Sequence, residues 1–232
     1  MLNCSLTLTA NAGIILEWNH HIIWIDALHN NQVPGFSTVS PALWQRMQTE
    51  LPPPELLCFT HCHPDHYSQQ FVSEAQSLWP TAKLLLPQQD FPDQLLLSGR
   101  EVRLTAGNLI LRFLRLPHDG GMDIQHYGLL LSNGSSHIFI SGDCEIASTV
   151  LSQCLEGIPI DLAVLNFPWL TLRQGRRYLE DVLRPHHLLL CHLPFPEDDI
   201  NSYLKAARHA AESTALPDVR LLTHPLQQEI IF

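Results

Sequence analysis

The heptapeptide Thr-His-Cys-His-Pro-Asp-His at residues 60–66 places three histidines and one aspartate within six consecutive positions. In an extended segment alternate side chains point the same way, so His61 and His63 can reach one common point. Asp65 and His66 follow at a turn and can face a second point nearby. Imidazole and carboxylate groups at this spacing suit zinc, iron or manganese. A polar loop that opens a helix is the alternative interpretation, and the density of ligand-type residues favours a metal site over it.

The composition is that of a globular protein. The chain has 232 residues, 45% hydrophobic and 16% charged, so it can bury a sizeable core. We expect one domain over residues 1–232, because no linker or low-complexity tract interrupts the pattern. No apolar run approaches the ~18 residues that span a bilayer, and no basic segment precedes the first apolar stretch. The sequence therefore predicts a soluble, cytoplasmic protein whose six scattered cysteines are free thiols.

The charge of the chain bears on its partners. The net charge is −10, and only two residues are lysine. Such a surface repels phosphate backbones and anionic lipid. We therefore expect a small-molecule substrate and neither a nucleic-acid nor a membrane partner. The sequence gives no indication of an oligomeric state.

Hydrophobic patterning predicts an opening of strands, followed twice by alternating strands and helices. This order favours two sheets with helices outside them. Strands are expected at residues 5–9, 13–18, 21–25, 56–60, 83–86, 101–105, 109–116, 127–132, 137–141, 160–166, 187–191, 219–223 and 229–232. Helices are expected at residues 41–50, 67–78, 146–154, 173–183 and 200–213.

Single polar residues recur where predicted strands end, namely Asp26, His118, Asp143 and His192. A strand that runs into an acid or a histidine brings that group to the rim of a core. Low polarity there strengthens metal binding and shifts pKa values. Taken one at a time, each residue is explained better by an ordinary turn at the end of a strand.

Taken together with the heptapeptide, these four residues resemble the metallo-β-lactamase superfamily. Members of that family have an aspartate after an early strand, then an H-x-H-x-D-H motif, then a histidine, an aspartate and a final histidine. This chain fills every one of those positions in order, from Asp26 to His192. The resemblance implies an α/β fold: a four-layer αββα sandwich of two mixed β-sheets flanked by helices.

The resemblance also implies a site for two divalent metal ions, with zinc expected and manganese or iron as alternatives. Asp65 and Asp143 are the expected catalytic carboxylates. Asp26 is expected behind the ligands, hydrogen-bonded to a ligand histidine so that its tautomer is fixed. The implied ligands are three for the first ion, three for the second and one bridging carboxylate. In that order they are His61, His63 and His118; Asp65, His66 and His192; and Asp143.

Such a site implies a metal-dependent hydrolase in which two ions activate a hydroxide against a small-molecule ester, lactone or related bond. The compact length of the chain and its Asp26 loop most resemble those of the ascorbate-6-phosphate lactonase branch. A phosphodiesterase or nuclease, and an iron-dependent oxidoreductase, are alternatives within the same superfamily. A binding protein without catalysis is disfavoured, because degenerate relatives lose ligands and this chain keeps them all.

The leaving group of such a reaction needs a proton donor. Tyr67, His29 and His224 are the candidates for donors or substrate contacts. Tyr67 directly follows the heptapeptide, and His224 follows a predicted strand as the ligands do. His29 lies in a turn-rich loop and is expected to be solvated. The remaining histidines, among them His126 and His186, are expected to be structural or exposed.

Overall fold

The computed structural model describes residues 2–232 and contains two β-sheets of seven strands each. The first sheet has the order β14-β1-β2-β3-β4-β5-β6. Pairing is antiparallel from β14 to β3 and parallel from β3 to β6. Its strands are β1 (Cys4–Leu8), β2 (Ile14–Trp18), β3 (His21–Ile25), β4 (Leu56–Cys58), β5 (Lys83–Leu86), β6 (Leu95–Leu96) and β14 (Gln228–Ile231).

The second sheet repeats this plan in the order β13-β12-β11-β10-β9-β8-β7. Pairing is antiparallel from β7 to β10 and parallel from β10 to β13. Its strands are β7 (Glu101–Ala106), β8 (Leu109–Arg115), β9 (Tyr127–Ser132), β10 (His137–Ile140), β11 (Leu162–Asn166), β12 (His187–Cys191) and β13 (Val219–Leu221).

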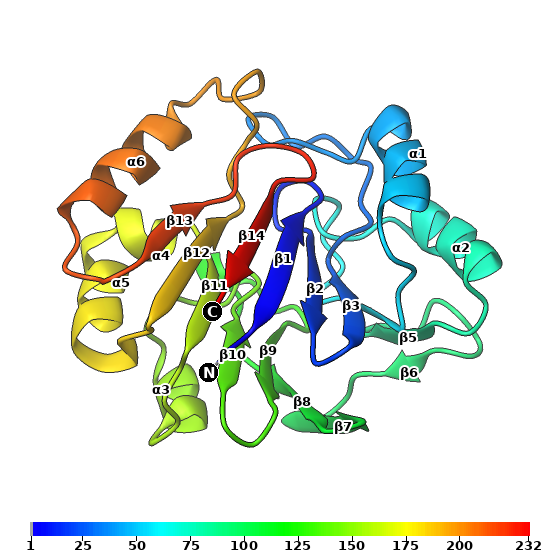
Figure 1. The fold of residues 1–232 in the computed structure, drawn as a ribbon, viewed down its shortest axis with the longest axis horizontal. Helices are drawn as coiled ribbons and strands as arrows, with labels where there is room; N and C mark the ends of the chain where they lie inside the picture. The colour runs from blue at the N-terminus through cyan, green and yellow to red at the C-terminus, as the bar shows by residue number, and fades with distance from the viewer. Residues whose placement is uncertain (1) are drawn as a thin grey trace.

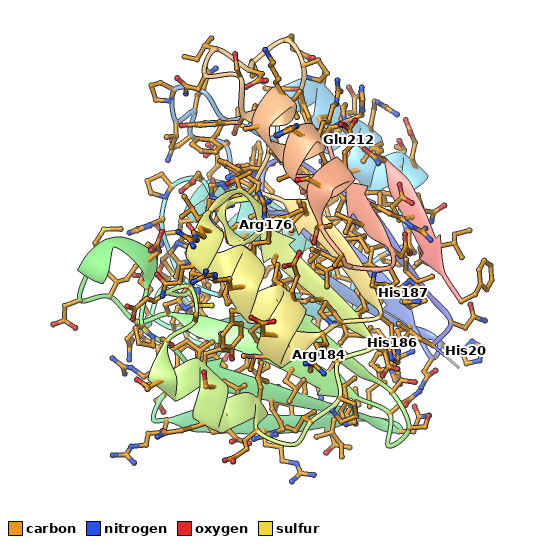
Figure 2. All side chains as sticks on the ribbon, turned by 90° about the vertical axis from the view of Figure 1, so that its left-hand side faces the viewer. His20, Arg176, Arg184, His186, His187 and Glu212 are labelled. Atoms are coloured by element: carbon orange, nitrogen blue, oxygen red, sulfur yellow. The ribbon has the colours of Figure 1, made fainter. Side chains whose placement is uncertain are left out.

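Helices cover the outer face of each sheet, which confirms the predicted four-layer αββα sandwich (Figure 1). Figure 2 views the molecule from the side of α5 and α6, with Arg176 labelled on α5. Over the first sheet lie α1 (Pro41–Glu50) and α2 (Gln69–Leu78). Over the second lie α3 (Thr149–Leu155), α4 (Pro168–Thr171), α5 (Arg173–Tyr178), the π-helical segment η2 (Leu179–Leu183) and α6 (Tyr203–Ser213). None of the helices within residues 2–232 is both long enough and apolar enough to cross a membrane.

The parallel strands are buried on both faces, because alternate residues enter different cores. On β11, Leu162 and Val164 belong to the core between the sheets, whereas Ala163 and Leu165 pack towards the outer helices. This explains why β11 reads as a continuous apolar run rather than an alternation. A strand covered on both sides leaves its end for polar side chains, and the candidate ligands lie at or beyond such strand ends.

The element boundaries differ from the predictions where capping decides them. The predicted helix 146–154 begins only at Thr149, because the Ser148 hydroxyl accepts a hydrogen bond from Leu151 N at 3.2 Å. Helix α2 begins at Gln69 rather than residue 67, since Ser68 caps it in the same way. The predicted helix 173–183 becomes π-helical after Tyr178. The sequence reasoning missed α4 and the two-residue strand β6.

The carboxyl ends of the central parallel strands point to one edge of the sandwich. Ligands in open α/β sheets bind outside this end of the strands. Asp26 directly follows β3, and the heptapeptide lies just beyond β4. Asp143 lies beyond β10 and His192 directly follows β12. Both sheets therefore deliver ligand-type residues to the same edge.

Candidate metal centre

The first group of candidate ligands is His61, His63 and His118. One ring nitrogen from each lies within 4.8 Å of the others. His61 and His63 lie in the segment after β4, and His118 lies after β8, so the group joins the two sheets. His61 is fully buried and His118 is 5% exposed, whereas His63 is partly open to solvent. The site can therefore be reached from the side of His63.

The second group is Asp65, His66 and His192, and its ligand atoms also lie within 4.8 Å of one another. His192 Nε2 lies 3.4 Å from Asp65 Oδ2. Ligands about 2.0–2.1 Å from a tetrahedral ion are separated by about 3.3–3.4 Å. The spacing of these two atoms is thus that of two ligands on one ion.

The carboxylate of Asp143 lies between the two groups. Its Oδ2 atom lies 3.9 Å from the Nε2 atoms of both His61 and His118, which belong to the first group. The same atom lies 3.3 Å from His66 Nε2 and 3.5 Å from His192 Nε2. One carboxylate oxygen therefore faces ligand atoms of both groups, and the structure brings all seven sequence-predicted ligands together.

Asp26 binds the Nδ1 side of His66 directly and that of His61 through Thr60. Its Oδ1 accepts a hydrogen bond from Thr60 N at 2.7 Å, and its Oδ2 accepts from the Thr60 hydroxyl at 2.6 Å and from His66 Nδ1 at 2.9 Å. Since the Thr60 hydroxyl donates to Asp26, its oxygen is free to accept from His61 Nδ1 at 3.0 Å. Asp26 and Thr60 thereby fix the Nδ1–H tautomer of two ligand histidines and leave each Nε2 free.

The unpaired nitrogens are what make the donor set fit a metal. The Nε2 atoms of His61, His66 and His118 are buried and make no hydrogen bond, although His66 Nε2 lies 3.3 Å from Asp143 Oδ2. A buried polar atom without a partner costs about 1–3 kcal/mol, so three in one place need an explanation. In His118, as in His61 and His66, Nδ1 is paired and Nε2 is left without a hydrogen bond: His118 Nδ1 donates to Asp119 O at 2.6 Å. Cations held by imidazole and carboxylate would satisfy all three atoms.

Two of the histidines have raised pKa values in the metal-free protein. Burial alone would lower the pKa of His192, but the carboxylates of Asp143 and Asp65 outweigh burial and raise it to about 9. His66 is also buried, yet Asp143 and Asp26 raise its pKa well above the usual range. Burial, reinforced by His66, holds the pKa of His61 well below its usual value. The carboxylates of Asp143, Asp65 and Asp26 therefore favour the protonated forms of His66 and His192.

We expect the stabilisation given by metal to grow with pH. A folded-state pKa raised to about 9 stabilises the metal-free protein below the unfolded value of ~6.5, and this stabilisation is lost as the pH rises through about 9. A metal ion held by His192 would also have to displace the proton of that ring, which is harder at low pH. Melting temperatures at a fixed, buffered free-metal concentration should show a larger metal-induced increase at about pH 8.5 than at about pH 6. An increase that is constant or falls with pH would contradict this.

The backbone at the site is strained where no glycine is present. Asp26 has φ 51° and His192 has φ 57°, both in the left-handed region that few side chains adopt. Such conformations concentrate at functional sites, because surrounding contacts hold them there. Gly142 has φ 52°, and a Cβ on it would lie 2.8 Å from the Thr60 Cβ and 2.7 Å from His126 Nε2. The residue before Asp143 must therefore be glycine.

The three predicted proton donors have different surroundings. Tyr67 donates its hydroxyl to Asp90 Oδ2 at 2.5 Å, and burial followed by Asp90 raises its pKa. The prediction that His29 is a solvated loop residue is wrong: its ring is fully buried, and its Nε2 pairs with Ala10 O at 3.1 Å. The loop packs inward, so burial lowers the pKa of His29 to about 4. His224 is exposed beyond β13, at the sheet edge that carries His192.

Several residues at the site were missed by the sequence reasoning. Asn166 ends β11, and its amide donates to Asp143 Oδ1 at 3.4 Å. Asn11 donates to Asp65 from the loop between β1 and β2. His126 is fully buried beside His61 and His118, with ring centroids 5.3 and 5.6 Å away, and burial lowers its pKa to about 3. Of these residues, only Asn166 could have been predicted from the sequence, because it is a polar residue at the end of an apolar strand.

One side of the site is aromatic. The partly exposed ring of Phe36 lies edge-on to His192, with the centroids 4.8 Å apart. Phe36 also stacks on Tyr203 at 5.6 Å, and Tyr203 packs against Phe167 at 4.8 Å. This aromatic wall places an apolar surface next to the second ligand group.

The chain is similar to solved structures in fold, at low sequence identity. No protein-family model and no curated protein sequence matches the chain. The metallo-beta-lactamase fold protein YhfI from Bacillus subtilis has a TM-score of 0.68 at 14% identity, covering 99% of this chain and 100% of YhfI. An isothiocyanate hydrolase from Delia radicum gut bacteria has a TM-score of 0.69 at 15% identity, and the match covers 97% of this chain and 98% of that protein.

A third similar structure belongs to a different class of enzyme. CmlA, a diiron beta-hydroxylase from Streptomyces venezuelae, has a TM-score of 0.64 at 16% identity. The match covers 100% of this chain and 55% of the CmlA chain. Identities of 14–16% show the fold alone. The two seven-stranded sheets, their flanking helices and these matches show that the chain has the metallo-β-lactamase fold.

Proposed function

We propose that the protein is a metal-dependent hydrolase that holds two divalent ions, with zinc as the first candidate. The observation that carries this proposal is the position of Asp143 Oδ2, within 3.9 Å of Nε2 atoms from both ligand groups. His61, His63 and His118 would hold one ion, with Asp143 shared. The second ion would be held by Asp65, His66 and His192.

The chain's own residues prepare this site for hydrolysis. Two divalent ions, when bound, lower the pKa of a shared water and stabilise negative charge that develops on the substrate. Asp26 and Thr60 keep the Nδ1 protons of His61 and His66 directed away from the centre. Asn166 holds Asp143 Oδ1, which fixes the direction of Oδ2. Of the three predicted proton donors, we propose His224, because its ring is exposed at this edge.

The substrate that we propose is a small ester, lactone or related molecule with an apolar part. The wall of Phe36, Tyr203 and Phe167 beside His192 supports the apolar part. The net charge of −10 disfavours polyanions. Membership of the ascorbate-6-phosphate lactonase branch stays a prediction from the sequence.

A reaction panel tests the proposal. Metal-free protein is reloaded with zinc, manganese or iron and assayed on p-nitrophenyl esters, lactones, bis-p-nitrophenyl phosphate and RNA, with oxygen uptake recorded in parallel. We expect ester or lactone hydrolysis that chelation abolishes and His118→Ala removes. His186→Ala is the matched control, because the His186 side chain is 72% exposed before β12, at the opposite end of that strand from His192 (Figure 2).

Two outcomes would replace the proposal with its alternatives. Cleavage confined to bis-p-nitrophenyl phosphate and RNA would indicate a phosphodiesterase or nuclease. Oxygen uptake by the iron-loaded protein without hydrolysis would indicate an oxidoreductase, the class to which the similar CmlA belongs.

A further inference from the structure

The loop between β1 and β2 forms a fixed support beneath the second ligand group. Within it, Thr9 N donates to Gly13 O and Gly13 N donates to Ala10 O, each at 2.8 Å. The Thr9 hydroxyl donates to Ala27 O at 3.2 Å, and the buried His29 ring donates to Ala10 O at 3.1 Å. Gly13 has no space for a side chain, since a Cβ there would lie 2.9 Å from Asp26 O. The loop is therefore held from several sides.

Asn11 lies at the top of this loop and contacts two members of the second ligand group. Its Nδ2 lies 3.2 Å from Asp65 O and 3.3 Å from Asp65 Oδ2, and donates to both. Its backbone carbonyl accepts a hydrogen bond from His192 N at 2.8 Å. Asp65 follows a strand of the first sheet and His192 a strand of the second. Asn11 thus connects two ligands that no shared element would hold together.

The conformation of Asn11 is specialised for these contacts. The side chain is fully buried, and the backbone has φ 51°, a left-handed conformation that asparagine tolerates better than most residues. The orientation of its amide follows from chemistry. The opposite orientation would direct an oxygen at the carbonyl and carboxylate oxygens of Asp65, which are acceptors only.

We propose that Asn11 is a positioning residue for the second metal ion. It sets the 3.4 Å separation between Asp65 Oδ2 and His192 Nε2, and with it the affinity for that ion. The inference rests on the proposed two-ion site. Asn11 makes no hydrogen bond to His61, His63 or His118. Removal of its side chain should therefore weaken binding of the second ion and leave binding of the first ion unchanged.

The test is a zinc titration of metal-free protein against a chromophoric chelator, which resolves successive equivalents. The principal variant is Asn11→Gly, because glycine adopts φ 51° without strain and the backbone carbonyl is kept. Asn11→Ala is the second variant. Outer-shell substitutions typically cost about 10–100-fold in metal affinity, and we expect that loss for the second equivalent with the first unchanged.

Thr214→Val is the matched control. It removes the 2.7 Å hydrogen bond from the Thr214 hydroxyl to Glu180, which belongs to neither ligand group nor the loop of Asn11, so it should leave both zinc equivalents as in the wild type. Wild-type affinity for both equivalents in the Asn11 variants would overturn the inference, as would an equal loss of both. A wild type that binds no second equivalent would overturn the two-ion site itself, which separates the two failures.

Discussion

Replacing Asp143 with alanine is expected to abolish most hydrolytic activity and to reduce the metal content of the protein. The carboxylate faces both ligand groups, at 3.3 Å from His66 Nε2 and 3.9 Å from His61 Nε2. In the proposed two-ion site, its loss would remove a ligand from each ion and a negative charge from beside His66 and His192. We expect a fall in kcat/KM on the order of a thousandfold, which corresponds to about 4 kcal/mol of transition-state stabilisation.

The comparison needs a variant that changes net charge equally without touching the site. Asp181→Ala serves, because Asp181 is an exposed aspartate on the outer π-helical segment η2. Elemental analysis and steady-state kinetics are measured for both variants and the wild type. If Asp143→Ala kept wild-type metal content and a kcat/KM within about tenfold of the wild type, Asp143 would not bridge the ions.

Replacing Asp26 with alanine is expected to destabilise the fold and weaken metal binding together. Asp26 is 1% exposed and accepts three hydrogen bonds, two from Thr60 and one from His66. Removal of one partner from a buried charged network typically costs about 3–5 kcal/mol. His66 and His61 would also lose the contacts that fix their tautomers, so metal affinity should fall about 10–100-fold.

Two further variants separate the causes of that loss. Asp26→Asn keeps a residue that tolerates φ 51°, so any loss of stability in it comes from the carboxylate rather than the backbone. Thr60→Val removes the hydroxyl and keeps the N–H that donates to Asp26, and it should have an intermediate effect. Denaturant unfolding gives the stability and zinc titration the affinity. An unfolding free energy within about 1 kcal/mol of the wild type for Asp26→Ala would contradict this account.

The sequence allowed the ligand positions to be predicted because strand ends are visible in it. An apolar run that stops at a histidine or an aspartate marked Asp26, Asp143 and His192, and the structure places all three at one edge. The same reasoning applied to β11 would have indicated Asn166. Asparagine is not a typical metal ligand, and its contribution here is a hydrogen bond to Asp143 Oδ1.

Other residues of the site depend on tertiary packing that leaves no local pattern. Asn11 lies in a loop between antiparallel strands, where turn formers are common whatever their role. His29 and His126 read as polar residues of loops, yet both are fully buried, because segments distant in sequence pack over them. The start of α3 depends on which serine caps it, and the apolar spacing alone does not settle that.

The most direct test of the two-ion site is the metal content of the wild-type protein after reconstitution and removal of loosely bound ions. This account predicts two divalent ions per chain, with fewer in His61→Ala and in Asp143→Ala. Metal content that stays unchanged in both variants, or a wild type that retains none, would contradict it.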